Sequence, residues 1–229
     1  MTQFKIIFIS LILSISFLFA NSQELVVTND LGAWLSAGFE KKIHKKLNLE
    51  FNQQVRLFKN FTKIDDIITN ITFSYRIDDN FSLAAGGRYT YNLDYFDNLQ
   101  HDFRYNLDFA YRYRFSSAFR FEYRLRFQNE YVNSFANSEF DKLQEAKFRN
   151  RLKLEYLHSQ AHKLYLSAEI YKTYKIFRLP YFSKTIFFIG DKISFGKQSL
   201  DISLGFQRDL NKTRPSNFGV LVLKYNLKL

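Results

Sequence analysis

Apolar and polar residues alternate with a period of two through long stretches of this chain. In the segment FRFEYRLRF, residues 119–127, every odd position is Phe, Tyr or Leu and every even position is Arg or Glu. This period places the two sets on opposite faces of a β-strand, whereas a helix would scatter both sets around its circumference. The pattern therefore predicts strands with one apolar and one charged face.

Eleven segments follow this pattern, and most are about twice as long as the strands of soluble domains. We expect strands at 31–43, 46–58, 67–77, 81–93, 101–115, 119–131, 145–157, 163–174, 182–195, 199–208 and 218–229. Short connections at 44–45, 78–80, 116–118 and 197–198 alternate with longer ones at 59–66, 94–100, 132–144 and 209–217. Outer-membrane barrels show this asymmetry, with short periplasmic turns and longer extracellular loops.

One hairpin allows its register to be predicted. A three-residue turn at 116–118 places opposite charges across from each other on the polar face, an arrangement that stabilises antiparallel pairs. The expected pairs are Arg112 with Glu122, Asp108 with Arg126, and Arg104 with Glu130.

The apolar face carries most of the 27 Phe and 15 Tyr residues. A soluble, lipocalin-like barrel would also alternate, but its tapering interior has little room for so many rings. Aromatic residues also gather near strand ends, as two girdles of a transmembrane barrel do: Tyr111, Tyr113 and Phe115 beside a short turn, and Tyr89, Tyr91 and Tyr95 beside a long loop. We therefore expect an all-β, transmembrane, antiparallel up-and-down β-barrel whose rings face lipid.

The first residues have the form of an export signal. Lys5 precedes the apolar run IIFISLILSISFLFA, and Ala20-Asn21-Ser22 has the small-x-small pattern of a cleavage site. We expect a cleaved signal peptide at 1–22 and an outer-membrane barrel at 23–229; the alternative is a retained N-terminal anchor. Such a barrel would be integral to the outer membrane of a Gram-negative bacterium, with both termini in the periplasm.

The number of strands is less clear than their existence. Bacterial single-chain barrels have an even number of strands, and the first and last segments both run from the loop side to the turn side. A twelfth strand at 24–28 would make the number even, so we expect ten to twelve strands and favour twelve. Ile193 and Phe195 are out of phase with Ile186 and Phe188, which predicts a β-bulge near Gly190-Asp191.

The polar face of the middle strands is strongly basic and should line the lumen. Asp102, Asp108, Glu122, Glu130, Glu145 and Glu155 offset only part of this charge, and we expect small or neutral groups on the opposite wall, at Asn52, Gln54, Thr72, Ser74, Ser82, Ala84 and Gly86. Either the charges form a network that closes the lumen, or they line a passage for anionic solutes. The expected basic wall consists of Arg104, Arg112, Arg114, Arg120, Arg124, Arg126, Lys147, Arg149, Arg151 and Lys153.

Residues for catalysis or metal binding are sparse. The chain has no Cys and four His, and no phosphate-binding loop or metal-ligand motif is present. Only His101 and Ser134 approach the Ser/His arrangement of a hydrolase, so we expect no enzyme activity and no catalytic, cofactor-binding or metal-binding residue.

The net charge of +11 is distributed between aromatic residues instead of forming a patch, which argues against nucleic acid as a partner.

Two amides, Gln53 and Asn150, interrupt otherwise apolar faces near mid-strand. Either the apolar wall simply tolerates them, or a protein contact on the outer wall shields them from lipid.

Four segments resemble an uncharacterised outer-membrane β-barrel family, domain of unknown function 2490, common in Bacteroidetes: AWLSAGFEKKIHKKLNLEFNQQVR, ITFSYRIDDNFSLAAGGRYTY, FRFEYRLRF and FRNRLKLEYL. The matching features are the early Trp34, the strand-ending Arg56, the turn Asp78-Asp79-Asn80 and the Arg-x-Arg strands. The resemblance implies an outer-membrane location and no established activity.

The expected role is that of a structural or binding barrel with a charge-networked lumen in an envelope assembly. The alternatives are a narrow, porin-like channel that prefers anions and an outer-membrane lipid hydrolase. Expected partners are outer-membrane lipid, the outer-membrane assembly machinery during insertion, and envelope proteins or an anionic solute. The last strand, GVLVLKYNLKL, resembles the C-terminal signal that this machinery recognises.

Overall fold

The computed structural model describes residues 28–93, 99–134, 145–175, 179–211 and 216–229, without the side chains at 93, 99–100, 132–134 and 145. The expected signal peptide at 1–22 and the start of the mature chain at Gln23 lie outside the described residues. No helix among the described residues has the length and apolar character needed to cross a membrane.

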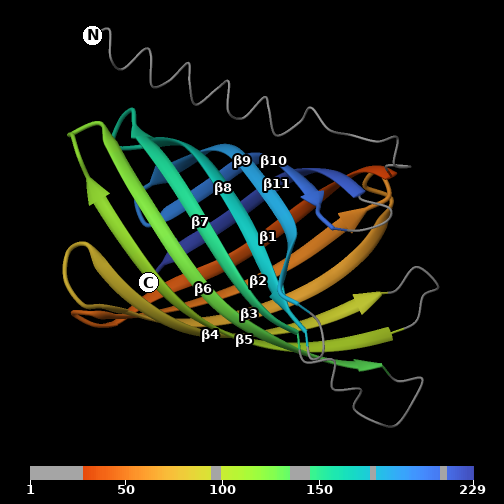
Figure 1. Cartoon of the computed structure of the whole chain (residues 1–229). Helices are drawn as coiled ribbons and strands as arrows, with labels where there is room; N and C mark the ends of the chain where they lie inside the picture. The colour runs from red at the N-terminus through yellow and green to blue at the C-terminus, as the bar shows by residue number, and fades with distance from the viewer. Residues whose placement is uncertain (1–27, 94–98, 135–144, 176–178, 212–215) are drawn as a thin grey trace, which may run out of the picture.

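Eleven long strands form one closed barrel (Figure 1). Each strand pairs with its neighbours in the sequence, so the sheet is an antiparallel meander that closes on itself. The strands are β1 (Thr28–His44), β2 (Leu47–Phe58), β3 (Lys63–Arg76), β4 (Phe81–Leu93), β5 (Leu99–Arg114), β6 (Phe119–Ser134), β7 (Glu145–Leu157), β8 (His162–Tyr174), β9 (Tyr181–Phe195), β10 (Gln198–Asp209) and β11 (Ser216–Lys228).

The barrel closes through a parallel pair, β1 with β11. Thr28 lies opposite Ser216, and the pairing continues without a break to Glu40 opposite Lys228. The preference for twelve strands was therefore wrong, and of the proposed extra strand only Thr28 is described, as the first residue of β1. The parallel ladder pairs the backbone N–H and C=O groups at the edges of β1 and β11, as an added strand would. A barrel with an odd number of strands therefore has no unpaired edge.

The two ends of the barrel differ. The short turns and Leu229 lie at one end, here the turn end, whereas the start of β1 and the last residues of β2, β4, β6, β8 and β10 lie at the other, here the loop end (Figure 1). We expected both termini at the same mouth. Because β1 and β11 are parallel, Thr28 and Leu229 instead lie at opposite mouths, and the N-terminus itself is outside the described residues.

The predicted strand boundaries agree closely with the structure, except at bulges. The strand expected to start at 67 begins at Lys63, because Asp65 is an extra residue between the pairs Arg56–Asp66 and Leu57–Ile64. The connection before it is therefore short, and Asp30 accepts hydrogen bonds from the backbone N–H groups of Lys59 and Asn60 at 3.0 Å each.

The bulge expected near Gly190-Asp191 is absent. β9 pairs with β10 in one unbroken register through these residues, and its irregularity lies instead near Ser183, opposite Tyr171 and Lys172. The change of phase in the sequence has another cause. Ile186 and Phe188 face the lumen, so this part of β9 is apolar on both faces.

The outer wall is apolar along its whole circumference. Large side chains on most strands are well exposed there, including Leu107, Leu166, Ile189 and Leu204, each more than half exposed. At the turn end, rings contact one another on this wall in two groups, as expected for a girdle: Phe81 with Tyr111 and Tyr111 with Tyr113, and Phe115 with Phe119 and Phe119 with Tyr156. Tyr95, expected in the second girdle, lies outside the described residues.

The two amides on the apolar wall are satisfied by neighbouring strands. Thr69 donates its hydroxyl to Oε1 of Gln53, and Tyr123 donates to Oδ1 of Asn150, both at 2.7 Å. Each oxygen therefore has a cross-strand partner within the barrel itself.

Candidate functional site: a basic cavity in the lumen

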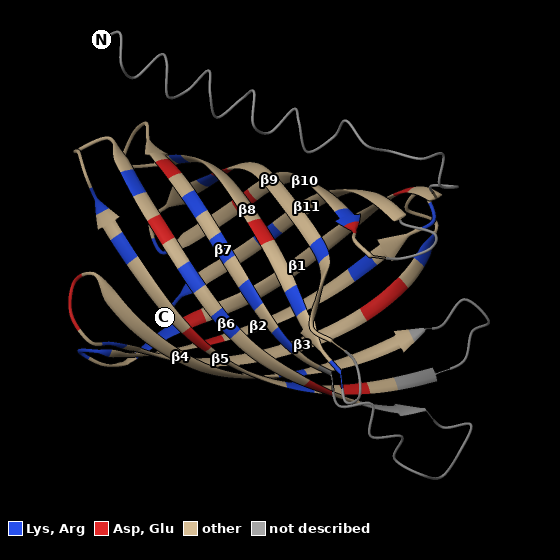
Figure 2. Cartoon of the chain, in the orientation of Figure 1, with Lys and Arg blue, Asp and Glu red and all other residues tan. Residues whose placement is uncertain are grey.

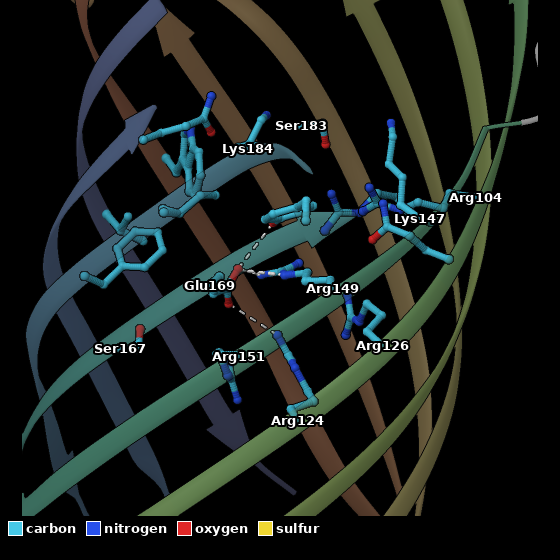
Figure 3. A pocket seen from close by; sticks show the side chains of 18 of the residues that line it. Arg104, Arg124, Arg126, Lys147, Arg149, Arg151, Ser167, Glu169, Ser183 and Lys184 are labelled. Atoms are coloured by element: carbon cyan, nitrogen blue, oxygen red, sulfur yellow. Dashed lines mark hydrogen bonds and ion pairs between the residues drawn. The ribbon is translucent and has the colours of Figure 1, made fainter. Parts of the chain in front are cut away.

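The lumen contains a cavity of about 760 Å³. Among the described residues, twelve Lys and Arg side chains line it against four Asp and Glu side chains. Figure 2 shows how densely basic residues band the strands around β6 and β7, and Figure 3 shows their side chains projecting inward. The basic lining consists of Arg56, Arg88, Arg104, Arg124, Arg126, Lys147, Arg149, Arg151, Lys153, Lys175, Lys184 and Lys224.

Seven of the ten residues expected in the basic wall line this cavity: Arg104, Arg124, Arg126, Lys147, Arg149, Arg151 and Lys153. The other three, Arg112, Arg114 and Arg120, lie closer to the turn end and are not part of its lining. The sequence reasoning did not include Arg56, Arg88, Lys175, Lys184 and Lys224. These five lie on or beside strands outside the run of Arg-x-Arg repeats, so no local pattern marks them.

The predicted β5–β6 register and all three of its ion pairs are confirmed. Arg126 holds Asp108 through two hydrogen bonds of 2.7 Å, and Arg112 Nε donates to Glu122 at 2.7 Å. Arg104 and Glu130 make the loosest pair, at 4.0 Å. Alternating charge along two neighbouring strands was therefore sufficient to fix their register.

Glu169 on β8 is the acidic centre of the cavity wall. Arg149 Nε donates to its Oε2 at 2.6 Å, and Arg124 Nη2 lies 3.6 Å from Oε1 (Figure 3). Its carboxylate is almost fully buried, and Tyr171 also donates to it at 3.3 Å. One carboxylate thus holds two arginines that come from neighbouring strands.

Arginines lie directly opposite one another on adjacent strands. The register pairs Arg124 with Arg151, Arg126 with Arg149, and Arg88 with Arg104. Like charges in such positions destabilise a sheet unless anions separate them. The acidic side chains of the wall do this for Arg126, Arg149 and Arg151, which contact Asp108, Glu169 and Glu122.

Arg88, Arg104 and Arg124 are the least neutralised members of the wall. Arg124 reaches Asp108 and Glu169 only at 3.9 and 3.6 Å, and its buried Nε has no hydrogen-bond partner among the described residues. The same is true of Nε of Arg104. Arg88 donates Nε to Asn70 at 2.6 Å and forms no ion pair with a described carboxylate. These three guanidinium groups therefore retain capacity for an anion.

Across the ring of strands, the lining changes character. Trp34 on β1, Ile186 and Phe188 on β9, and Val222 on β11 form what we call the apolar patch. The rings of Trp34 and Phe188 are 6.0 Å apart, and the guanidinium of Arg56 lies 4.4 Å from the centroid of the Trp34 ring. Sequence reasoning missed this patch and expected small or neutral groups opposite the basic wall; of that expected set only Gln54 lines the cavity.

Toward the turn end, ion pairs link neighbouring strands on the lumen side of β5, β6 and β7. Glu122 contacts both Arg112 and Arg151, and Glu155 contacts both Arg120 and Lys153. Among the described residues, the lining of the cavity includes neither Glu122 nor Glu155. Lys175 and Tyr181, at the loop end, do line it. We call this arrangement a cup, with its mouth at the loop end and the network of charges, its floor, on the turn-end side.

The hydrolase-like pair of the sequence is only partly visible. His101 lies opposite Asn133 on β6 as expected, and its Nδ1 hydrogen-bonds the hydroxyl of Tyr89. The side chain of Ser134 lies outside the description. A second histidine, His162, holds Asp191 at 2.6 Å on the outer wall near the turn end. No group of His, Asp and Glu that could hold a metal ion occurs in the described part of the chain.

The sequence profile of a family described as a protein of unknown function, DUF2490, matches residues 31–218. The chain belongs to this family. The matched region runs from the start of β1 into β11, so the family profile covers nearly the whole DUF2490 barrel described above. No curated protein and no solved structure matches the chain.

Proposed function

We propose that this DUF2490 chain is an integral outer-membrane barrel of a Gram-negative bacterium that binds an anionic solute in its lumen. The cavity with twelve basic and four acidic lining residues carries the proposal. A low-dielectric wall with excess positive charge concentrates anions, and guanidinium groups form strong charge-assisted hydrogen bonds with carboxylates and phosphates.

The outer wall supports the membrane location. Soluble monomers rarely expose contiguous apolar patches larger than a few hundred Å², whereas exposed Leu, Ile, Phe and Tyr surround this barrel. All strands have 12 to 17 residues, enough for the roughly 9 to 11 that a tilted transmembrane strand requires. In this proposal the short turns face the periplasm, and outer-membrane lipid covers the apolar wall.

A titration with inorganic phosphate at low millimolar concentration tests anion binding. Trp34 is the only tryptophan and lines the cavity, so its fluorescence in the purified barrel should change in a saturable manner. Replacing Arg124 by Gln should weaken binding about tenfold, since a charge-assisted hydrogen bond contributes about 1.5 kcal/mol. A response that is absent, or equally strong without Arg124, would contradict the proposal.

A narrow anion-preferring channel is the second candidate, because rings of charged side chains set selectivity in pores. The charge network near the turn end favours the closed cup. Planar bilayers separate the two: the cup should give no stable conductance, and the channel small anion-selective steps. Large cation-selective steps would be incompatible with both.

The proposal includes no catalytic residue and no cofactor, and the prediction that the chain is not an enzyme stays a prediction. Replacing His101 or Ser134 by Ala should leave the phospholipid and lipid A composition of the cells unchanged. A lipid product that depends on both side chains would favour the hydrolase instead.

A further inference from the structure

The apolar patch is unusual for the inside of a membrane barrel. Inward-facing positions of such barrels are ordinarily polar, because strands alternate apolar residues outside with polar residues inside. Trp34, Phe188 and Val222 face inward and are only partly buried. They leave apolar surface in contact with a cavity whose other wall is strongly basic.

A glycine lies beneath one of the rings of the patch. A Cβ atom added at Gly205 would lie 2.4 Å from Cε1 of Phe188, so the ring occupies the space where a side chain would otherwise begin. The ring therefore lies along the wall of β10, which leaves the lumen open in front of it.

The two walls face each other across one cavity. In the ring of strands, β6 and β7 lie about as far from β1 as the barrel permits, and both sides line the same space. A purely inorganic anion would use only the basic side. A volume of about 760 Å³ is also within the range of roughly 300 to 1,000 Å³ that pockets for drug-sized organic ligands have.

We propose that the ligand is an amphiphilic monocarboxylate, with its carboxylate among Arg88, Arg104 and Arg124 and its hydrocarbon chain against the apolar patch. This inference rests on the proposed function and adds the chemical class of the anion. The carboxylate would accept hydrogen bonds from the least neutralised guanidinium groups, whereas each buried CH₂ group would contribute up to about 0.8 kcal/mol.

Three probes of related chemistry test it: octanoate, acetate and 1-octanol. Octanoate has both parts of the ligand, acetate lacks the chain, and octanol lacks the charge. With the barrel in lipid nanodiscs, Trp34 fluorescence should saturate with octanoate at concentrations at least about 100-fold lower than with acetate. Octanol should give no saturable response that depends on Arg124.

Variants assign the two halves of the site. Phe188→Ala should weaken octanoate binding much more than acetate binding, whereas Arg124→Gln should weaken both. Leu204→Ala, at the most exposed large apolar side chain on the outer wall of the described strands, is the control and should change neither. Chemical shifts of carboxyl-labelled octanoate provide a second readout that does not depend on Trp34.

The outcomes distinguish this inference from the proposed function. If phosphate binds and octanoate is no better than acetate, the amphiphilic ligand is overturned and anion binding stands. If octanol binds with the same affinity as octanoate and displaces it, the basic wall does not contribute to binding and the inference fails. If no anion binds, both proposals fail.

Discussion

At the scale of single residues, a glycine and a glutamate shape the cavity. Gly205 gives the Phe188 ring its place against the wall, and Glu169 draws Arg124 and Arg149 together. Neither role follows from residue type alone, because each depends on a neighbour from another strand.

Gly205→Ala should displace the Phe188 ring into the cavity. The added methyl group would require a shift of the ring, and such overpacking costs about 1 to 3 kcal/mol. We expect a lower unfolding temperature and an altered Trp34 emission. Gly87→Ala is the matched control, since its Cβ would meet nothing within 4 Å and should leave both unchanged. Equal behaviour of the two variants would contradict the packing described for Phe188.

Glu169→Gln should change stability and anion binding in opposite directions. Removing this buried carboxylate leaves Arg149 without its ion-pair partner and Arg124 with Asp108 alone, which lowers the stability of the barrel by about 3 kcal/mol and raises its affinity for phosphate. Arg120→Gln breaks the ion pair of Arg120 with Glu155, neither of which lines the cavity, so it should lower stability alone. Denaturant unfolding and Trp34 titrations on both variants provide the comparison.

At the scale of strands, the sequence predicted the features that recur along the chain, namely the alternating strands and their charge pattern. It did not predict the features that occur at single places, namely the bulges and the apolar patch. Alternation located all eleven strands, and the charge pattern around Ser116-Ser117-Ala118 fixed the register of β5 and β6. The bulges at Asp65 and Ser183 were missed, because one extra residue looks like the end of an alternating segment. The apolar patch was missed because its members lie on three strands far apart in the chain.

The parallel seam can be tested by cross-linking. Ala37 on β1 and Tyr225 on β11 are paired, and paired Cα atoms in a sheet are close enough for a disulfide. In this Cys-free chain, the double variant Ala37→Cys/Tyr225→Cys should oxidise to an internal cross-link, visible as a mobility shift of denatured protein that reducing agent reverses. Ala37→Cys with Leu204→Cys, on β10, should not cross-link. A twelfth strand between β1 and β11 would prevent the first disulfide.

At the scale of the whole molecule, the barrel combines an apolar exterior with an interior of opposite charges and one cup-shaped cavity. The floor of ion pairs gives the two mouths different character. Under the proposed function, this asymmetry makes the orientation in the membrane important, because a solute would enter from the loop end.

Labelling of intact cells determines that orientation. Leu179, the most exposed of the large apolar side chains described, lies between β8 and β9 at the loop end, whereas Ser117 lies in a turn at the opposite end. A membrane-impermeant maleimide should react with the Leu179→Cys variant and not with Ser117→Cys until the cells are lysed. Preferential reaction at Ser117→Cys would invert the topology.

The parallel closure also limits how this barrel could be rebuilt. Circular permutation succeeds where chain ends lie near each other at the surface. Here a peptide joining Lys228 to Thr28 would have to span the full length of the seam, on the order of 40 Å along paired strands. No short linker can span this distance. Circular permutation, which suits even-stranded barrels, is therefore not feasible for this barrel with a short linker. The same geometry makes the barrel a two-sided display scaffold, because peptides grafted at its two ends emerge from opposite mouths.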